Sequence, residues 1–196
     1  MTLNQLKQDF ENLLYKALKD YIKIKLDEIP NENIYAFVAY CDDGCMSISG
    51  AIATIESYNE TIKLRPIYEN DLITPEICPP EWKYIYEHNH VFDKLNKFLS
   101  TIYDEFYEGE FEEDYMDELD EDELNELISS FFIDTIIKVF IKLRNDNVFK
   151  FKHFKSDVLL GALFSDPDEG SRKIMLGVSK KLNSPTWHSK LSNYWN

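Results

Sequence analysis

The chain has 196 residues, with 36 acidic side chains against 21 basic ones, so its formal net charge is −15. This excess of acid argues against a general nucleic-acid-binding protein and against binding to anionic membrane surfaces, because both need basic residues. Hydrophobic residues make up 44% and aromatic residues 14%, too many for an intrinsically disordered chain, and the length suits one domain over residues 1–196.

The charge imbalance is confined to one segment. Residues 104–126 contain 14 acidic side chains and no lysine or arginine, which leaves 22 acids against 21 bases in the rest of the chain. The body of the protein is therefore nearly neutral, and the acidic segment needs its own explanation.

The first third of the chain predicts a helix, a β-hairpin and a second helix. Apolar residues spaced three and four apart predict an amphipathic helix over 3–26. Aromatic and β-branched runs at 34–41 and 45–52 predict two strands, joined by Asp42-Asp43-Gly44, whose glycine supplies the positive φ of the turn. A threonine cap begins a short helix over 54–65.

The middle of the chain predicts a loop followed by a helix. Several prolines mark residues 65–80 as a long ordered loop. Pro80-Glu81-Trp82 is typical of a helix start, because proline is tolerated in the first turn. An apolar stripe then predicts a helix over 90–107, which ends at Gly109.

The last third predicts two long helices on either side of two strands. A capping box begins a helix over 120–144. Alternating apolar and basic residues predict a half-exposed strand near 148–154, and a continuous apolar run predicts a buried strand near 157–164. Ser171 is expected to cap a helix that ends near residue 182. Together these elements predict an α+β fold, an antiparallel sheet with a central β-hairpin packed by several amphipathic helices.

The sequence predicts a cytoplasmic protein without a cofactor or a metal. Charged residues interrupt the first apolar run, so no secretory signal is expected, and no apolar window is long enough to span a bilayer. Cys41, Cys45 and Cys78 lack the paired spacing of a zinc site. A Cys41–Cys45 bridge across the hairpin turn is conceivable, but free thiols are favoured in a reducing compartment.

Two further clusters of polar residues, and Trp82, are better explained by structural roles than by a metal, catalytic or ligand site. His88 and His90 lie near Glu87 without a third metal ligand, so surface histidines are favoured over a metal site. The acids of 166–169 suit the turn before a helix better than a cation site or a catalytic carboxylate pair. Trp82 is expected to anchor the core rather than stack on a ligand.

The acidic segment has three interpretations. An EF-hand loop needs a central glycine, which the run 120–123 lacks. A run of like charges is most often a solvated face. Acids with interleaved aromatics can instead dock on a basic partner and attract it over a distance. The aromatic residues in question are Phe106, Tyr107, Phe111 and Tyr115.

Several short motifs, taken in order, resemble one bacterial family. They are Ile34-Tyr35-Ala36-Phe37, Asp42-Asp43-Gly44, Pro80-Glu81-Trp82, Val148-Phe149, Ser165-Asp166-Pro167-Asp168 and Val178-Ser179-Lys180-Lys181-Leu182-Asn183. This order resembles the domain-of-unknown-function family 4303. The resemblance implies one α+β domain over nearly the whole chain, carries over no catalytic residues, and implies an immunity role beside bacterial toxins. The acidic insert is heavier than the family pattern.

The favoured hypothesis is therefore a non-enzymatic bacterial binding protein, and specifically an immunity protein that blocks a basic toxin by occlusion. Seven acids are predicted to contact the partner: Glu110, Glu113, Asp114, Asp117, Glu118, Asp120 and Glu121. One alternative is an enzyme or small-ligand protein with a pocket at the helix–sheet junction near Trp82, Tyr84 and His88. Another is a structural or regulatory domain that the acidic segment keeps in solution.

Overall fold

The fold is built from ten α-helices and strands in the part of the chain that the computed structural model describes, residues 2–42, 45–65, 67–68, 71–108, 119–164 and 166–195. In chain order they are α1 (Leu3–Glu28), β1 (Ile34–Cys41), β2 (Ile48–Thr54), α2 (Ile55–Leu64), α3 (Thr74–Ile77), α4 (Asp93–Glu108), α5 (Glu121–Asn145), β3 (Phe154–Phe164), α6 (Glu169–Leu182) and α7 (Pro185–Trp195). Within these ranges, no helix combines the length and apolar character that crossing a membrane requires.

The three strands form one sheet in the order β2-β1-β3. β1 pairs antiparallel with β2, as the predicted hairpin requires, and Phe37 lies opposite Ile52. On its other edge β1 pairs parallel with β3, where Phe37 lies opposite Leu160. The α+β class is confirmed, but the sheet is mixed rather than antiparallel. The cause is the long helical connection after β2, which brings the chain back to the end of the sheet where β1 begins.

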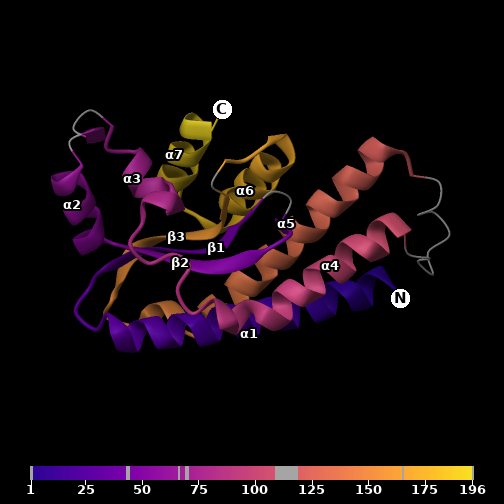
Figure 1. Ribbon diagram of the computed structural model, residues 1–196, viewed down its shortest axis with the longest axis horizontal. Helices are drawn as coiled ribbons and strands as arrows, with labels where there is room; N and C mark the ends of the chain where they lie inside the picture. The colour runs from indigo at the N-terminus through magenta and orange to yellow at the C-terminus, as the bar shows by residue number, and fades with distance from the viewer. Residues whose placement is uncertain are drawn as a thin grey trace.

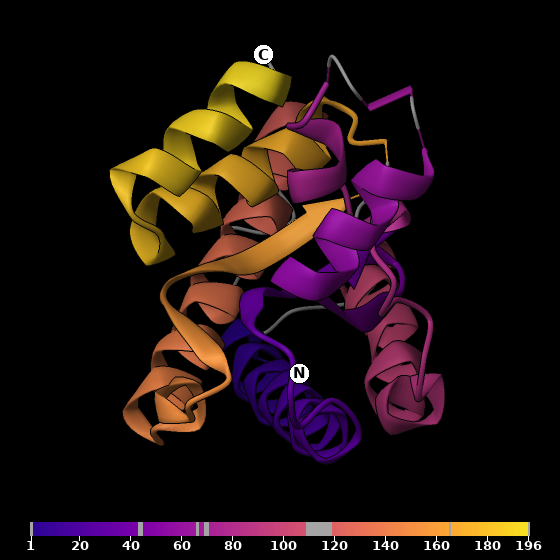
Figure 2. The same ribbon diagram turned by 90° about the vertical axis from the view of Figure 1, so that its left-hand side faces the viewer.

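Helices cover both faces of the sheet (Figures 1 and 2). α1 and α4 lie together on one face, and α6 and α7 lie on the other. α5 runs along the side of the sheet and contacts α1 as well as α6. This arrangement places the start of α5 between the last turns of α4 and the first turns of α6.

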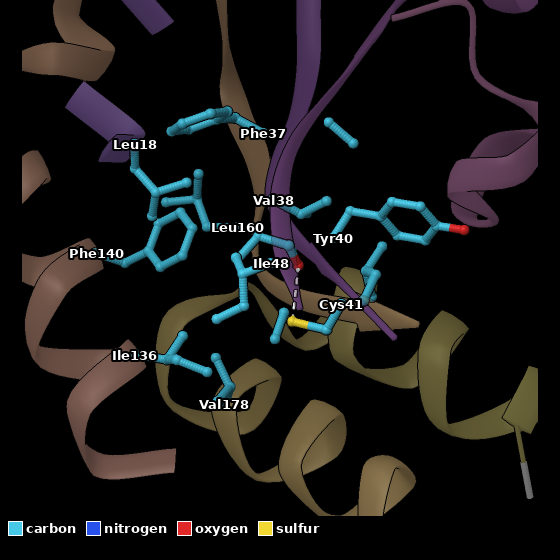
Figure 3. Close-up of a cluster of buried hydrophobic side chains, with 14 of the residues drawn as sticks. Leu18, Phe37, Val38, Tyr40, Cys41, Ile48, Ile136, Phe140, Leu160 and Val178 are labelled. Atoms are coloured by element: carbon cyan, nitrogen blue, oxygen red, sulfur yellow. Dashed lines mark hydrogen bonds between the residues drawn. The ribbon is translucent and has the colours of Figure 1, made fainter. Parts of the chain in front are cut away.

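The centre of the core lies between β1 and the helices. Phe37 contacts Tyr21 of α1 and Phe140 of α5, with ring centroids 6.3 and 5.9 Å apart. Figure 3 shows Phe37, Phe140 and Leu18 gathered on one side of β1. Gly50 of β2 allows α1 to approach closely, because a Cβ there would lie 2.3 Å from Cδ1 of Tyr21. Aromatic packing against the hairpin therefore fixes the position of α1.

Two predicted turns have different backbone details. The hairpin is confirmed, but Gly44 lies outside the described residues, and Cys45 has the positive φ, at 62°. The predicted cap of the penultimate helix is wrong by three residues. Asp168 caps α6, and its Oδ1 accepts a hydrogen bond from the backbone N–H of Ser171 at 2.7 Å.

Three predictions of secondary structure are wrong. The segment predicted as a strand near 148–154 starts with a 3₁₀ helix at Val148–Lys150, and β3 then runs unbroken from Phe154. Pro79–Glu81 forms only one 3₁₀ turn, and the expected loop over 65–80 contains α3. α7 was not predicted, although Pro185 occupies its first position, where proline is favoured.

The outer edge of β3 is partly closed by a side chain. Asn183, just after α6, accepts a hydrogen bond from the backbone N–H of Leu160 and donates one to its C=O, both at 2.8 Å. The asparagine amide thus takes the place of a neighbouring strand. Unpaired edges promote association between chains, so this contact stabilises the end of the sheet beside α6.

Candidate functional site: an acidic groove between three helices

The predicted partner-binding acids are only partly within the described residues. Five lie outside them: Glu110, Glu113, Asp114, Asp117 and Glu118. The other two, Asp120 and Glu121, begin α5. Oδ1 of Asp120 accepts a hydrogen bond from the backbone N–H of Glu123 at 2.9 Å, and Glu123 Oε2 accepts one from the backbone N–H of Asp120 at 3.1 Å. The predicted capping box is confirmed, so Asp120 has a structural role, whereas Glu121 is simply exposed.

A groove of about 700 Å³ lies beside these acids. It opens where the last turns of α4, the first turns of α5 and the start of α6 meet, and Figure 1 shows α5 between the other two helices. Its volume falls within the range of small-molecule and side-chain binding clefts. Its described lining residues belong to α4, α5 and α6 and to the N-cap of α6.

The groove has acidic walls. Asp122 and Glu126 line it from α5, and Asp168 and Glu169 line it from α6, against a single lysine, Lys173. Lys173 forms an ion pair with Glu126 across the two helices. Hydrogen bonds from the backbone and side chain of Ser171 lower the pKa of Asp168, so its carboxylate stays ionised at neutral pH. The groove therefore has a net negative charge.

Two tyrosines of α4 form the third wall. Tyr103 and Tyr107 stack with centroids 6.3 Å apart and rings inclined by 10°. Tyr103 also packs against Phe132, and burial raises the pKa of its hydroxyl, while Tyr107 is 58% exposed. Phe106, predicted among the aromatics of a docking surface, is instead buried against Phe131, with centroids 5.4 Å apart. Phe111 and Tyr115 lie outside the described residues.

Trp82, Tyr84 and His88, the residues named for the alternative pocket, lie in the segment before α4. Trp82 and Tyr84 are buried, as the prediction of a core tryptophan implied, and Tyr84 donates a hydrogen bond to Glu32. His88 Nε2 lies 2.8 Å from Oε1 of Glu28. None of the three predicted side chains lines the acidic groove or the aromatic cavity described below.

Next to these residues lies a charged cluster that the sequence did not indicate. Lys25 of α1 is 2% exposed, and its Nζ lies 2.7 Å from Glu28 Oε2 and 2.6 Å from Glu87 Oε2. Tyr86 and His88, on either side of Glu87, have positive φ angles of 58° and 55°. Such backbone strain persists only where the surroundings hold it. The cluster therefore fastens the segment before α4 to the end of α1.

An aromatic cavity of about 290 Å³ lies on the opposite side of the sheet from α1. Tyr35 of β1, Tyr58 of α2 and Trp187 of α7 line it. The ring centroids of Tyr35 and Trp187 are 6.0 Å apart. The cavity contains its own cation, because Lys190 Nζ lies 4.7 Å from the centre of Trp187 and 2.7 Å from both carboxylate oxygens of Glu76. Sequence reasoning missed this site because it missed α7.

The cysteines are structural in this fold. Cys41, Cys45 and Cys78 are free and buried, so no Cys41–Cys45 bridge is formed. Burial raises the pKa of Cys41 well above its usual range and that of Cys78 to about 11. The thiols of Cys41 and Cys78 therefore stay protonated at neutral pH. Within the described ranges, no three His, Cys, Asp or Glu side chains lie close enough together to hold a metal ion.

The comparison with known proteins gives one match. The model of a domain-of-unknown-function family, DUF4303, matches residues 14–184, which is most of the chain and includes α5, β3 and α6. The resemblance noted from the order of the sequence motifs is thereby confirmed. No curated protein and no solved structure matches the chain.

Proposed function

Since the chain belongs to the DUF4303 family, whose function is unknown, we propose a function from its own residues: it binds a basic protein partner through its acidic surface. The observation that carries the proposal is the acidic groove, in which four carboxylates and an exposed tyrosine face one lysine. Binding surfaces commonly combine complementary charge with aromatic anchors.

The described acids divide into those with a structural role and those without one. Asp120, Glu123 and Asp168 accept capping hydrogen bonds at the starts of α5 and α6. Glu121 and Asp122 have no such contact among the described residues and are exposed, so their negative charge is available to a partner. Together with the acids of 110–118 they form the proposed contact surface.

The proposed role is that of a bacterial immunity protein, acting in the cytoplasm on a basic toxin such as a nuclease. Such a toxin carries lysines and arginines where it binds phosphates. An acidic protein attracts this surface over a distance and then covers it, so inhibition needs no catalysis. The mechanism is occlusion of the toxin's substrate-binding face.

The test uses a secreted toxin with a basic C-terminal domain encoded beside this chain's gene. Co-expression of the chain should restore growth to cells that this domain kills. Association of the purified chain with an inactive form of the domain should slow about tenfold or more between 50 and 300 mM salt, because exposed charges are screened over a few ångströms at high salt.

A charge-neutral variant separates the proposal from a merely soluble acidic domain. Asp117→Asn, Glu118→Gln, Asp120→Asn and Glu121→Gln together remove four charges, and asparagine at 120 retains a helix cap. A matched control, Asp27→Asn with Glu60→Gln, neutralises exposed acids of α1 and α2. Only the first variant should lose protection. Equal protection by both variants would contradict the proposal.

A further inference from the structure

The aromatic cavity has two opposite charges on one wall that do not pair. Lys155 and Asp157 lie two residues apart on β3, and both line the cavity. Neither forms an ion pair with any side chain in the described part of the chain. Oδ2 of Asp157 accepts a hydrogen bond from Oγ of Ser184 at 2.8 Å. The strand therefore presents one cation and one anion whose charges are not neutralised by a close partner.

The other two charged side chains of the cavity neutralise each other. Nζ of Lys190 lies 2.7 Å from both carboxylate oxygens of Glu76, and it also lies over the ring of Trp187. This pair has no net charge and no carboxylate oxygen without a donor. Lys155 and Asp157 are therefore the charged groups of the cavity that remain for a ligand.

Three aromatic rings provide the apolar walls of the cavity. The ring of Tyr35 stacks with that of Trp187 and meets that of Tyr58 edge to face, with centroids 6.2 Å apart. Both tyrosine hydroxyls already donate to backbone C=O groups, that of Tyr35 to Glu76 and that of Tyr58 to Leu72. The rings therefore offer apolar surface, and aromatic rings pack on one another in these stacked and edge-to-face arrangements. A volume of about 290 Å³ suits a small ligand.

We infer that the aromatic cavity binds a free aromatic amino acid, with its carboxylate on Lys155, its ammonium on Asp157 and its ring against the three aromatic walls. Side chains two positions apart on a strand lie on the same face, about 7 Å apart. An α-amino acid carries both charges on one carbon, so it can bridge this gap, whereas the end of a peptide chain carries only one of them. The site is separate from the acidic surface and goes beyond the proposed function.

The experiment titrates the ¹⁵N-labelled full chain with L-phenylalanine and with two derivatives that each lack one charge. N-acetyl-L-phenylalanine has no ammonium and L-phenylalanine amide has no carboxylate. Each should bind about tenfold more weakly, because each loses a hydrogen bond between charged groups. L-alanine lacks the ring and should bind at least as weakly. The indole N–H of Trp187, which donates to the backbone C=O of Asp157, should shift most among the three tryptophans.

Substitutions in β3 assign the two charges of the ligand. Lys155→Met should weaken binding of L-phenylalanine about tenfold and leave binding of the amide unchanged. Asp157→Asn should weaken binding of L-phenylalanine and leave binding of the N-acetyl derivative unchanged. Both side chains are exposed, so the variants should fold as the native chain does. Lys152→Met, a matched control at an exposed lysine outside the cavity, should change none of these affinities.

Three results would overturn the inference. They are the absence of saturable binding of L-phenylalanine, equal affinities for L-phenylalanine and its two derivatives, and binding that Lys155→Met weakens no more than Lys152→Met does. None of these results bears on the proposed function, because the aromatic cavity and the acidic groove share no lining residue among those described.

Discussion

The burial of Lys25 in α1 predicts that substituting the lysine and substituting its carboxylate partners change the free energy of unfolding by different amounts. Lys25 is the only buried charged side chain among the described residues, and it contacts the carboxylates of Glu28 and Glu87 and the ring of Tyr84, 4.4 Å from its Nζ. Its two carboxylate partners are 41% and 42% exposed. We therefore expect that removing the lysine is tolerated and that removing its partners is not.

The expected magnitudes follow from the burial of each group. Lys25→Met places an apolar chain of similar size in the core, and both carboxylates can return to water, so the free energy of unfolding should change by about 1 kcal/mol or less. Glu28→Gln with Glu87→Gln leaves a buried ammonium unpaired. That costs about 3–5 kcal/mol when the whole pair is buried. With partners at the surface we expect about 3 kcal/mol, or about 6–12 °C in Tm for a chain of this length.

Urea unfolding at pH 7 measures both changes, with Lys23→Met as a control on the exposed face of α1. Hydrogen bonds from Lys25 and His88 lower the pKa of Glu28 from 4.5. Its contribution to stability is therefore present above pH 4.5 and is lost as pH falls through the lowered value. Lys25→Met should weaken this acid dependence. The reasoning is refuted if Lys25→Met destabilises the chain as much as the double glutamine variant does.

Three further predictions can be checked by the same unfolding experiment. Gly50→Ala should cost about 2–3 kcal/mol, because its Cβ would overlap the ring of Tyr21. Gly170→Ala should be neutral or stabilising by up to about 1 kcal/mol, because its Cβ would lie 3.8 Å from Asp168 Oδ1, an ordinary van der Waals contact. Asp168→Ala should cost about 1 kcal/mol as the cap of α6 is lost, and Asp168→Asn should cost almost nothing. Asn183→Ala should cost about 1–3 kcal/mol and increase light scattering, because it unpairs the backbone of the β3 edge.

Local signals in the sequence predicted the parts of the fold that depend on neighbouring residues. The helix of 3–26, the capped helix of 54–65 and the helix of 120–144 agree with α1, α2 and α5 within two residues at each end. Each has apolar spacing or a cap that acts within one or two turns. The hairpin also depends on residues close in sequence, and its strands pair as expected.

The wrong and missing elements depend on distant contacts. β3 begins at Phe154 because its ladder to β1 starts there, with Ile34 opposite Phe154, and no alternation of apolar residues encodes that parallel register. The Lys25 cluster joins residues 62 positions apart, so neither Lys25 nor Glu87 looked unusual in the sequence. The same holds for the acidic groove, whose walls come from α4, α5 and α6.

The groove changes how the acidic segment is understood. From sequence alone, its 14 acids formed one group, and a solvated face explained them as well as a docking surface did. In the structure, two of them, Asp120 and Glu123, form the capping box of α5. Asp122 and Glu126 line a groove together with acids at the start of α6, which lie outside the segment. A solvated face does not require acids from a second helix to converge beside an exposed tyrosine. The groove is therefore the part of the acidic surface where substitution should most directly separate binding from solubility.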